Sequence, residues 1–178
     1  MRYLQGTKDF MFTFRRSNNL EVGYSDSDFA GCIDSRKSTF GYLFMLVTGA
    51  ISWKNAKQTV IASSTMEAEF VACSEATVHG LWLQNFISRL GIVDSIFKPL
   101  RIYCDNFVAV FFSKNDKYSK GAKHMELKYL TVKEDVQKQR MSIEHISTQL
   151  MVANPLTKGL ALKTFKEHVN QMGLENST

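Results

Sequence analysis

The stretch 100–112 reads LRIYCDNFVAVFF, and it places one aspartate where an apolar strand gives way to a helix. Residues 100–104 are mostly apolar and rich in β-forming types, the pattern of a strand buried on both faces. The run 107–112 follows at once with helical spacing. In open α/β sheets, ligands and catalytic groups gather at the carboxyl ends of the strands. Asp105 stands at such an end, so the stretch predicts an α/β fold with a carboxylate at the functional edge of its sheet.

Asp105 has two interpretations on these residues alone. An aspartate directly before a helix is a common N-cap, because its carboxylate accepts a hydrogen bond from an amide of the first turn. The same carboxylate could instead bind a metal ion in a catalytic site. The choice depends on whether other carboxylates reach Asp105 from elsewhere in the chain.

The composition is that of one compact intracellular domain. Of 178 residues, 44% are hydrophobic and 12% aromatic, which is enough to fill a core. The three cysteines form no CxxC pair and the four histidines are scattered, so neither a zinc site nor a disulfide framework is expected. No signal peptide or membrane span of ~20 apolar residues is evident, so we expect a protein that is not secreted and has no membrane partner. A net charge of +5 permits a nucleic-acid partner without requiring one.

Three strands, antiparallel to one another, are expected before the first long helix. Residues 20–26 alternate with a period of two and carry Asp26, as a half-buried strand does. The run 39–47 is aromatic and β-branched, and a Thr-Gly turn leads into a third strand that begins over 50–53. This pattern is typical of a hairpin.

A long helix begins within residues 63–70, which read SSTMEAEF. Ser64 followed by Glu67 is a capping-box pattern, in which each side chain satisfies the other residue's free backbone amide. Because successive helical residues are ~100° apart, Glu67 and Glu69 point to nearly opposite sides. Glu69 shares its side with small and apolar residues, so this face should lie on the sheet. The stripe comprises Glu69, Cys73, Ala76, Gly80, Leu83, Ile87 and Leu90.

The C-terminal half adds helices around one more strand. A second amphipathic helix is expected over about 124–139 and a fifth strand over 141–146. Asn154 and Pro155 predict the start of a last helix, with the asparagine as N-cap and the proline at the first helical position.

Three carboxylates stand on elements that such a fold could bring together: Asp26, Glu69 and Asp105. Neighbouring strands lie ~4.8 Å apart, so Asp26 and Asp105 could share a metal ion if their strands pair. Buried carboxylates without a cationic partner shift their pKa or coordinate a cation, and oxygen ligands favour Mg²⁺ or Mn²⁺. Carboxylate-bound metal pairs cleave phosphodiesters. On spacing alone this remains a hypothesis, because acidic residues are common.

Seven motifs follow one another through nearly the whole chain: YSDSDFAGCIDSRKSTFGYLFML, GAISWKNAKQ, SSTMEAEFVAC, EATVHGLWL, IYCDN, AKHMELKY and ANPLTKGL. In this order they resemble the ribonuclease H domain of copia-type LTR retrotransposon polyproteins, of the plant-like sort. The resemblance divides the chain into a tether from the reverse transcriptase side over 1–18, a ribonuclease H-like domain over 19–160, and a C-terminal helix and tail over 161–178.

The resemblance implies an α/β fold of the ribonuclease H-like three-layer kind. Its five-stranded mixed sheet has the order 3-2-1-4-5 with helices on both faces, so strands one and four lie side by side. The implied function is metal-dependent hydrolysis of the RNA strand of RNA–DNA hybrids during reverse transcription, with two Mg²⁺ (or Mn²⁺) ions. The implied partners are the hybrid and the reverse transcriptase domain of the same polyprotein. The implied location is a cytoplasmic virus-like particle or the nucleus.

The family's metal-binding carboxylates fall on Asp26, Glu69 and Asp105, and its fourth falls on Asn154. Asparagine keeps an oxygen ligand but loses the negative charge. Four carboxylates balance two divalent ions, whereas three leave one positive charge over, so we expect a weaker second metal site and slower turnover. The alternative is a decayed or domesticated module that binds nucleic acid or protein without cutting, or a purely structural remnant.

Further residues have weaker predicted roles. Trp53 and Trp82 are expected in the core rather than as exposed stacking surfaces. A capping role is equally open for Ser64, and a solvated helix start is equally open for Lys123 and His124. Nucleic-acid contacts are predicted for Ser63, Ser64, Thr65, Asn106, Lys123 and His124.

Overall fold

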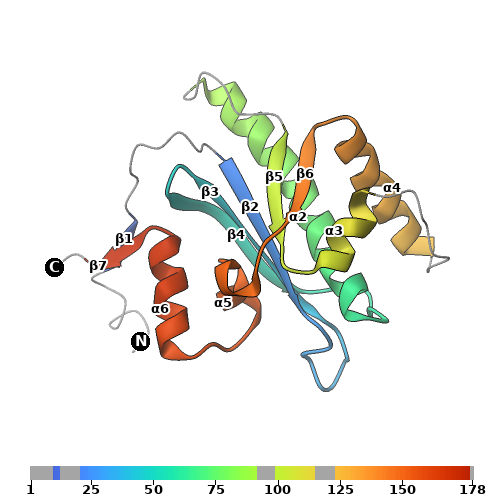
Figure 1. Cartoon of the computed structure of the whole chain (residues 1–178), viewed down its shortest axis with the longest axis horizontal. Helices are drawn as coiled ribbons and strands as arrows, with labels where there is room; N and C mark the ends of the chain where they lie inside the picture. The colour runs from blue at the N-terminus through green and yellow to red at the C-terminus, as the bar shows by residue number, and fades with distance from the viewer. Residues whose placement is uncertain (1–9, 13–20, 92–98, 115–122, 177–178) are drawn as a thin grey trace.

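The computed structural model describes residues 10–12, 21–91, 99–114 and 123–176, arranged as a twisted sheet with helices on either side (Figure 1). In chain order the elements are β1 (Phe10–Phe12), β2 (Glu21–Asp28), β3 (Thr39–Leu46), β4 (Gly49–Lys57), α2 (Thr65–Leu90), β5 (Leu100–Cys104), α3 (Phe107–Lys114), α4 (Lys123–Gln137), β6 (Met141–His145), the 3₁₀ turn η1 (Thr148–Leu150), α5 (Asn154–Thr157), α6 (Leu162–Gln171) and β7 (Leu174–Asn176).

The main sheet has five strands in the order β4-β3-β2-β5-β6. β2, β3 and β4 are antiparallel neighbours, whereas β2 pairs with β5 and β5 pairs with β6 in parallel. Counted within this sheet, the order is 3-2-1-4-5, as predicted. The labels are higher by one because β1 comes first and pairs with β7 in a separate two-stranded ladder, which the sequence did not predict.

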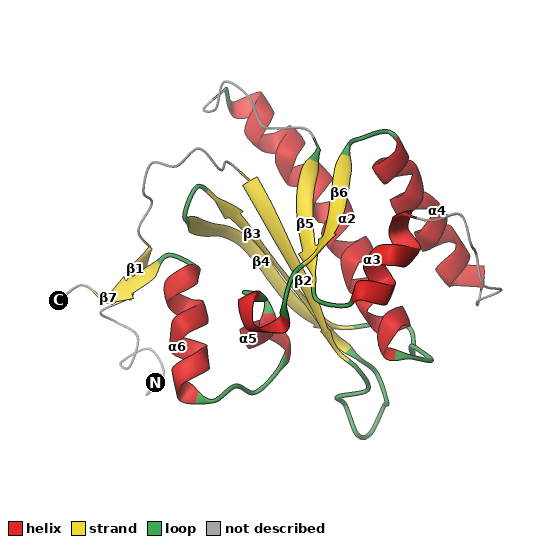
Figure 2. Ribbon diagram, viewed as in Figure 1, coloured by secondary structure: helices red, strands yellow, loops and turns green. Residues whose placement is uncertain are grey.

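The two faces of the sheet hold two separate cores. Side chains alternate across a strand, so neighbouring residues of β3 face opposite layers. Phe44 packs with Ile102 and with the buried face of α2, while Leu43 packs with Val152 and Met172 from the C-terminal segment. Figure 2 shows α2 behind the strands and α5 in front of them. The chain therefore has the predicted three layers.

Helix α2 lies close to the sheet because Gly80 has no side chain. A Cβ at this position would lie 2.6 Å from Leu100 Cδ2 and 2.7 Å from Phe44 Cε1, which is closer than carbon atoms pack. The predicted stripe is buried from Glu69 to Ile87, but Leu90 is 50% exposed. The last turns of α2 extend beyond the strand ends (Figure 1), so the sheet does not cover Leu90.

Most of the predicted capping interactions of α2 are present in the structure. Ser64 is the N-cap, and its hydroxyl accepts a hydrogen bond from the Glu67 amide at 3.2 Å. The Glu67 carboxylate accepts from the Ser63 amide at 2.6 Å, not from the Ser64 amide as the reciprocal capping box predicted. Gly91 closes the helix in the left-handed conformation, with φ of 63°.

The predicted last helix is two helices, and Asn154 does not cap either of them. Ala153 occupies the N-cap position of α5, so Asn154 and Pro155 are its first two residues. The Asn154 amide instead donates to the Thr148 carbonyl at 2.8 Å. This tertiary partner, which the local pattern could not reveal, takes the side chain away from the helix start.

Gly41 allows α5 to approach the sheet. It pairs with Asp26 in the β2–β3 ladder. A Cβ on Gly41 would lie 2.8 Å from Leu156 Cβ and 2.9 Å from Thr157 Cγ2, too close for any larger residue without movement of α5. The glycine therefore brings the C-terminal end of α5 within reach of Asp26.

The two tryptophans are exposed, contrary to the prediction. Trp53 is 51% exposed on the edge strand β4 and packs on Phe12. Trp82 is 57% exposed on the outer side of α2 and stacks on Phe86. Among the described helices, none has the length and apolar character needed to cross a membrane.

Candidate active site

Asp26 lies on β2 and Asp105 directly follows β5, the parallel neighbour of β2, as the site hypothesis required. Ser25 of β2 is in register with Cys104, the last residue of β5, so the residues that follow them, Asp26 and Asp105, come to the same edge of the sheet. Asp26 is completely buried, and Asp105 is partly buried at the strand end.

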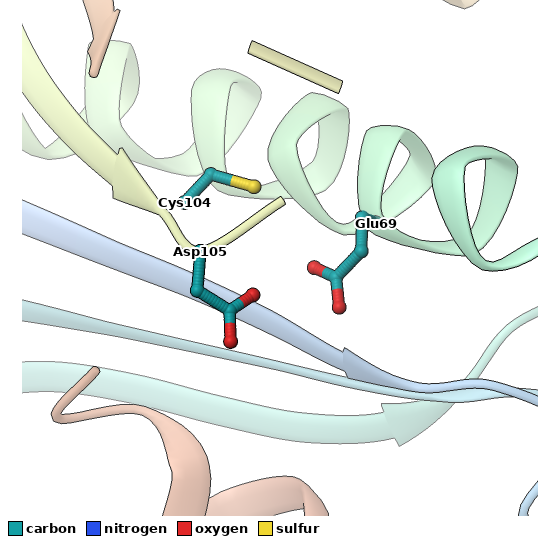
Figure 3. Close-up of side chains that lie close together, drawn as sticks. All are labelled: Glu69, Cys104 and Asp105. Carbon is teal, nitrogen blue, oxygen red and sulfur yellow. The ribbon is translucent and has the colours of Figure 1, made fainter. Parts of the chain in front are cut away.

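Helix α3 is capped by another residue, so the interpretation of Asp105 as the N-cap of this helix is wrong. The Asn106 side-chain oxygen accepts a hydrogen bond from the Ala109 amide at 2.9 Å. This is the usual N-cap contact, so the cap is Asn106. The Asp105 carboxylate turns toward Glu69 instead (Figure 3).

Glu69 enters the site from the first turns of α2 and is only 2% exposed. Its Oε1 accepts from the Ser27 amide at 3.3 Å, whereas no described group bonds its buried Oε2. Burial and, to a smaller extent, the nearby Cys104, Asp26 and Asp105 raise the pKa of Glu69 to about 10, although Lys158 acts to lower it. A buried carboxyl group with a free oxygen has capacity for a cation.

Glu69, Cys104 and Asp105 converge on one point. One potential ligand atom from each lies within 4.8 Å of the others, and Figure 3 shows the two carboxylates directed into the same space. The Cys104 pKa is raised well above its ordinary value, first by a hydrogen bond with Cys73 and then by burial. Cys104 is therefore a neutral thiol, which a hard ion such as Mg²⁺ does not select. The sequence did not indicate this proximity, although Cys104 directly precedes Asp105.

Asp26 is bound by groups of the chain itself. Lys158 Nζ donates to Asp26 Oδ1 at 2.7 Å, and the Thr157 hydroxyl donates to Asp26 Oδ2. Burial lowers the pKa of Lys158, but Asp26, together with Asp105 and Glu69, raises it by more, so the net shift is upward and the lysine stays charged. The sequence analysis missed both residues; the signal was the Leu-Thr-Lys run that follows Asn154 and Pro155.

Asn154 joins the same group through Lys158. It is 4% exposed, and its Oδ1 lies 3.4 Å from Lys158 Nζ, from which it accepts a hydrogen bond. Its Nδ2 donates to the Thr148 carbonyl at 2.8 Å. Because an ammonium only donates and a carbonyl only accepts, these two partners fix the orientation of the amide.

The predicted nucleic-acid contacts lie on three helix starts. Ser63 and Ser64 bond Glu67 at the start of α2, which Thr65 begins. Asn106 caps α3. Lys123 and His124 begin α4, but their side chains lie outside the described part of the structure. A role for these six residues in binding nucleic acid stays a prediction.

The donor set fits a divalent cation. Glu69 and Asp105 offer carboxylate oxygens, the ligands that Mg²⁺ and Mn²⁺ prefer. Oε2 of Glu69 is buried without a hydrogen-bond partner among the described residues, and the Glu69 carboxylate lies beside that of Asp105 (Figure 3). All four predicted ligand positions lie in one region, with Glu69 beside Asp105 and Asp26 linked to Asn154 by Lys158.

The sequence relatives of the chain are much longer proteins. It is 36% identical over 177 residues to the "Retrovirus-related Pol polyprotein from transposon TNT 1-94" of Nicotiana tabacum, a match that covers 99% of this chain and 13% of the relative. It is 33% identical to the corresponding polyprotein from transposon RE2 of Arabidopsis thaliana, covering 98% of this chain and 12% of the relative. The chain thus spans about an eighth of the length of these curated relatives. No family model matches it.

Solved structures with the same fold are ribonucleases H. The LC11 ribonuclease H1, solved in complex with an RNA/DNA hybrid, matches with a TM-score of 0.53 at 15% identity, covering 77% of this chain and 93% of that one. At this identity the likeness establishes the fold, which is ribonuclease H-like.

Proposed function

We propose that this chain, whose homologues are copia-type retrotransposon Pol polyproteins and whose fold is that of ribonuclease H, is a metal-dependent endonuclease that hydrolyses the RNA strand of RNA–DNA hybrids. The observation that carries the proposal is the convergence of Glu69 and Asp105, with one buried carboxylate oxygen left without a hydrogen-bond partner among the described residues. A cation bound between these two carboxylates would satisfy that oxygen.

Each residue of the site has a distinct role in the proposed reaction. Glu69 and Asp105 hold the ion, with Asp26 and Asn154 beside them. A divalent ion bound here supplies the Lewis acidity that phosphodiester hydrolysis needs, and the resemblance implies two such ions. Lys158 places a positive charge beside the same carboxylates, where it can attract the phosphate backbone of a substrate.

The proposed enzyme must distinguish an RNA–DNA hybrid from duplex DNA. A hybrid differs from duplex DNA in its 2′-hydroxyl groups and its A-like shape. The serines and threonine at the start of α2 adjoin Glu69 in the chain and are suited to bond the RNA backbone. We propose that the enzyme works with the reverse transcriptase domain of the same polyprotein, in a cytoplasmic virus-like particle or the nucleus.

Cleavage of a labelled hybrid in Mg²⁺ or Mn²⁺ tests the proposal. The wild-type chain should cut the RNA strand, and Asp105→Asn should abolish cutting because it removes a carboxylate from the ion. Asp34→Asn is a matched control, since it makes the same change in the exposed loop that follows β2. Absence of cleavage by the wild type, or cleavage that survives Asp105→Asn, would refute the proposal.

A decayed or domesticated module that binds without cutting is the second candidate, and the neutral Asn154 is the observation that favours it. Asn154→Asp separates the two candidates. A large gain of cleavage from almost none would indicate decay at this position, whereas little change would indicate that the enzyme works with asparagine.

A further inference from the structure

The buried carboxylate of Asp26 has both of its oxygens occupied by the C-terminal segment. Lys158 Nζ lies 2.7 Å from Oδ1, and the Thr157 hydroxyl bonds Oδ2. The Asp26 side chain is completely buried, whereas the Lys158 side chain is 32% exposed. A buried carboxylate without a partner is strongly unfavourable, so Lys158 supplies a cation that Asp26 requires. The group of converging ligand atoms is accordingly Glu69, Cys104 and Asp105, without Asp26.

We propose that the Lys158 ammonium is a resident cation of the active site, and that the site consequently takes up one divalent ion at Glu69 and Asp105 instead of two. This inference rests on the proposed function for the existence of a metal site, and it concerns the number of ions that the site holds.

The formal charges support a single ion. Asp26, Glu69 and Asp105 contribute three negative charges when all are ionised, as metal binding requires, and Lys158 contributes one positive charge. The remaining two negative charges balance one divalent ion. A second ion would leave two positive charges in a buried site, which is costly.

Asn154 is matched to this arrangement. Its amide oxygen faces the Lys158 ammonium, and its amide nitrogen donates to the Thr148 carbonyl. An aspartate could not make the second bond, because an ionised carboxylate only accepts. Three carboxylates, one ammonium and one amide therefore form a complete set, and the missing fourth carboxylate need not be a sign of decay.

The number of ions is measured directly by calorimetric titration with Mn²⁺ and by the electron paramagnetic resonance of free Mn²⁺, without substrate. The wild type should bind one ion, and Asn154→Asp should still bind one because Lys158 stays in place. The double variant Asn154→Asp with Lys158→Met has four carboxylates and no resident cation, and it should bind two. Lys158→Met alone should bind its one ion about tenfold more tightly, because a repelling positive charge is lost.

Two further variants serve as controls. Lys158→Arg retains the charge and should keep the wild-type stoichiometry. Lys163→Met removes one positive charge from the exposed face of α6 and should change neither the stoichiometry nor the affinity. Together they distinguish the position of the charge from the net charge of the protein.

Three results would overturn the inference. Two ions on the wild type would do so even if the double variant failed to fold. One ion on a folded double variant, or no ion on the wild type, would do so as well. Hybrid cleavage, assayed separately, keeps the two proposals apart: a cleaving wild type that binds two ions retains the proposed function and loses only this inference.

Discussion

Replacing Gly41 with alanine should separate α5 from the sheet. The new Cβ would stand 2.8 Å from Leu156 Cβ and 2.9 Å from Thr157 Cγ2. Carbon atoms pack at about 3.5–4.0 Å, so α5 must move by about 0.7 Å or more. Lys158 follows α5 directly in the chain, and its ammonium bonds Asp26, so the movement should loosen the contact between α5 and the buried carboxylate.

Two contributions of opposite sign determine the effect of Gly41→Ala on stability. Overpacking a core contact typically costs about 1–3 kcal/mol, whereas glycine inside a strand is worse than alanine by about 0.5–1 kcal/mol. We expect Gly41→Ala to lower the free energy of unfolding by about 1–2 kcal/mol, although strand propensity alone predicts a gain. A shift of 1 Å in an active site costs ~100-fold in rate, so hybrid cleavage should fall by about 10- to 100-fold.

Urea denaturation and hybrid cleavage measure the two effects on the same preparation. Gly159→Ala is the matched control, because it makes the same substitution next to Lys158 at a site where a Cβ meets nothing within 4 Å. It should leave both quantities nearly unchanged. If Gly41→Ala were as stable and as active as the wild type, the approach of α5 would not depend on the glycine, and the reasoning would be wrong.

Three further outcomes are expected. The Glu69 pKa of about 10 means that the folded protein keeps a proton which the unfolded chain loses above its ordinary pKa of about 4.5. Without metal, the contribution of Glu69 to stability should therefore be fully present below pH 4.5 and decline as the pH rises toward 10. Thermal unfolding of wild type and Glu69→Gln over this pH range should show the decline as the difference between the two proteins. Cys104→Ser should leave Mg²⁺ affinity unchanged in calorimetry, because the thiol is neutral, but it should weaken Cd²⁺ binding, since soft ions select sulfur. Asn106→Ala should cost about 0.5–2 kcal/mol in denaturant unfolding, as the loss of an N-cap does; an unchanged stability would contradict the assignment of Asn106 as the cap that bonds the Ala109 amide.

The strands and the choice of Glu69 were predictable because they depend on local periodicity. A period of two placed Asp26 on a strand, and a period of 3.6 placed Glu69, not Glu67, against the sheet. The order of the five strands came from the resemblance to a known family, since periodicity gives elements but not their neighbours. The structure confirms that order.

The errors lie where tertiary contacts override local patterns. Asn154 precedes a proline as an N-cap does, but a carbonyl six residues earlier in the chain binds its amide. The partners of Asp26 stand 131 and 132 residues away, beyond the range of any local signal. Trp53 lies in a strand at the edge of the sheet, and composition does not reveal which strand is at the edge.

The pairing of β1 with β7 has a mechanical consequence for a domain within a longer chain. Phe10 pairs with Asn176 and Phe12 with Leu174, so a pull on the residues flanking this ladder acts on one end of it. Antiparallel bonds loaded in this way open one after another, as in a zipper, at a low force. The small ladder stands apart from the five-stranded sheet in Figure 1, and its opening would absorb the extension before tension reached the strands that carry Asp26 and Asp105. Single-molecule stretching from these two points should show a short, weak first step ahead of the main rupture.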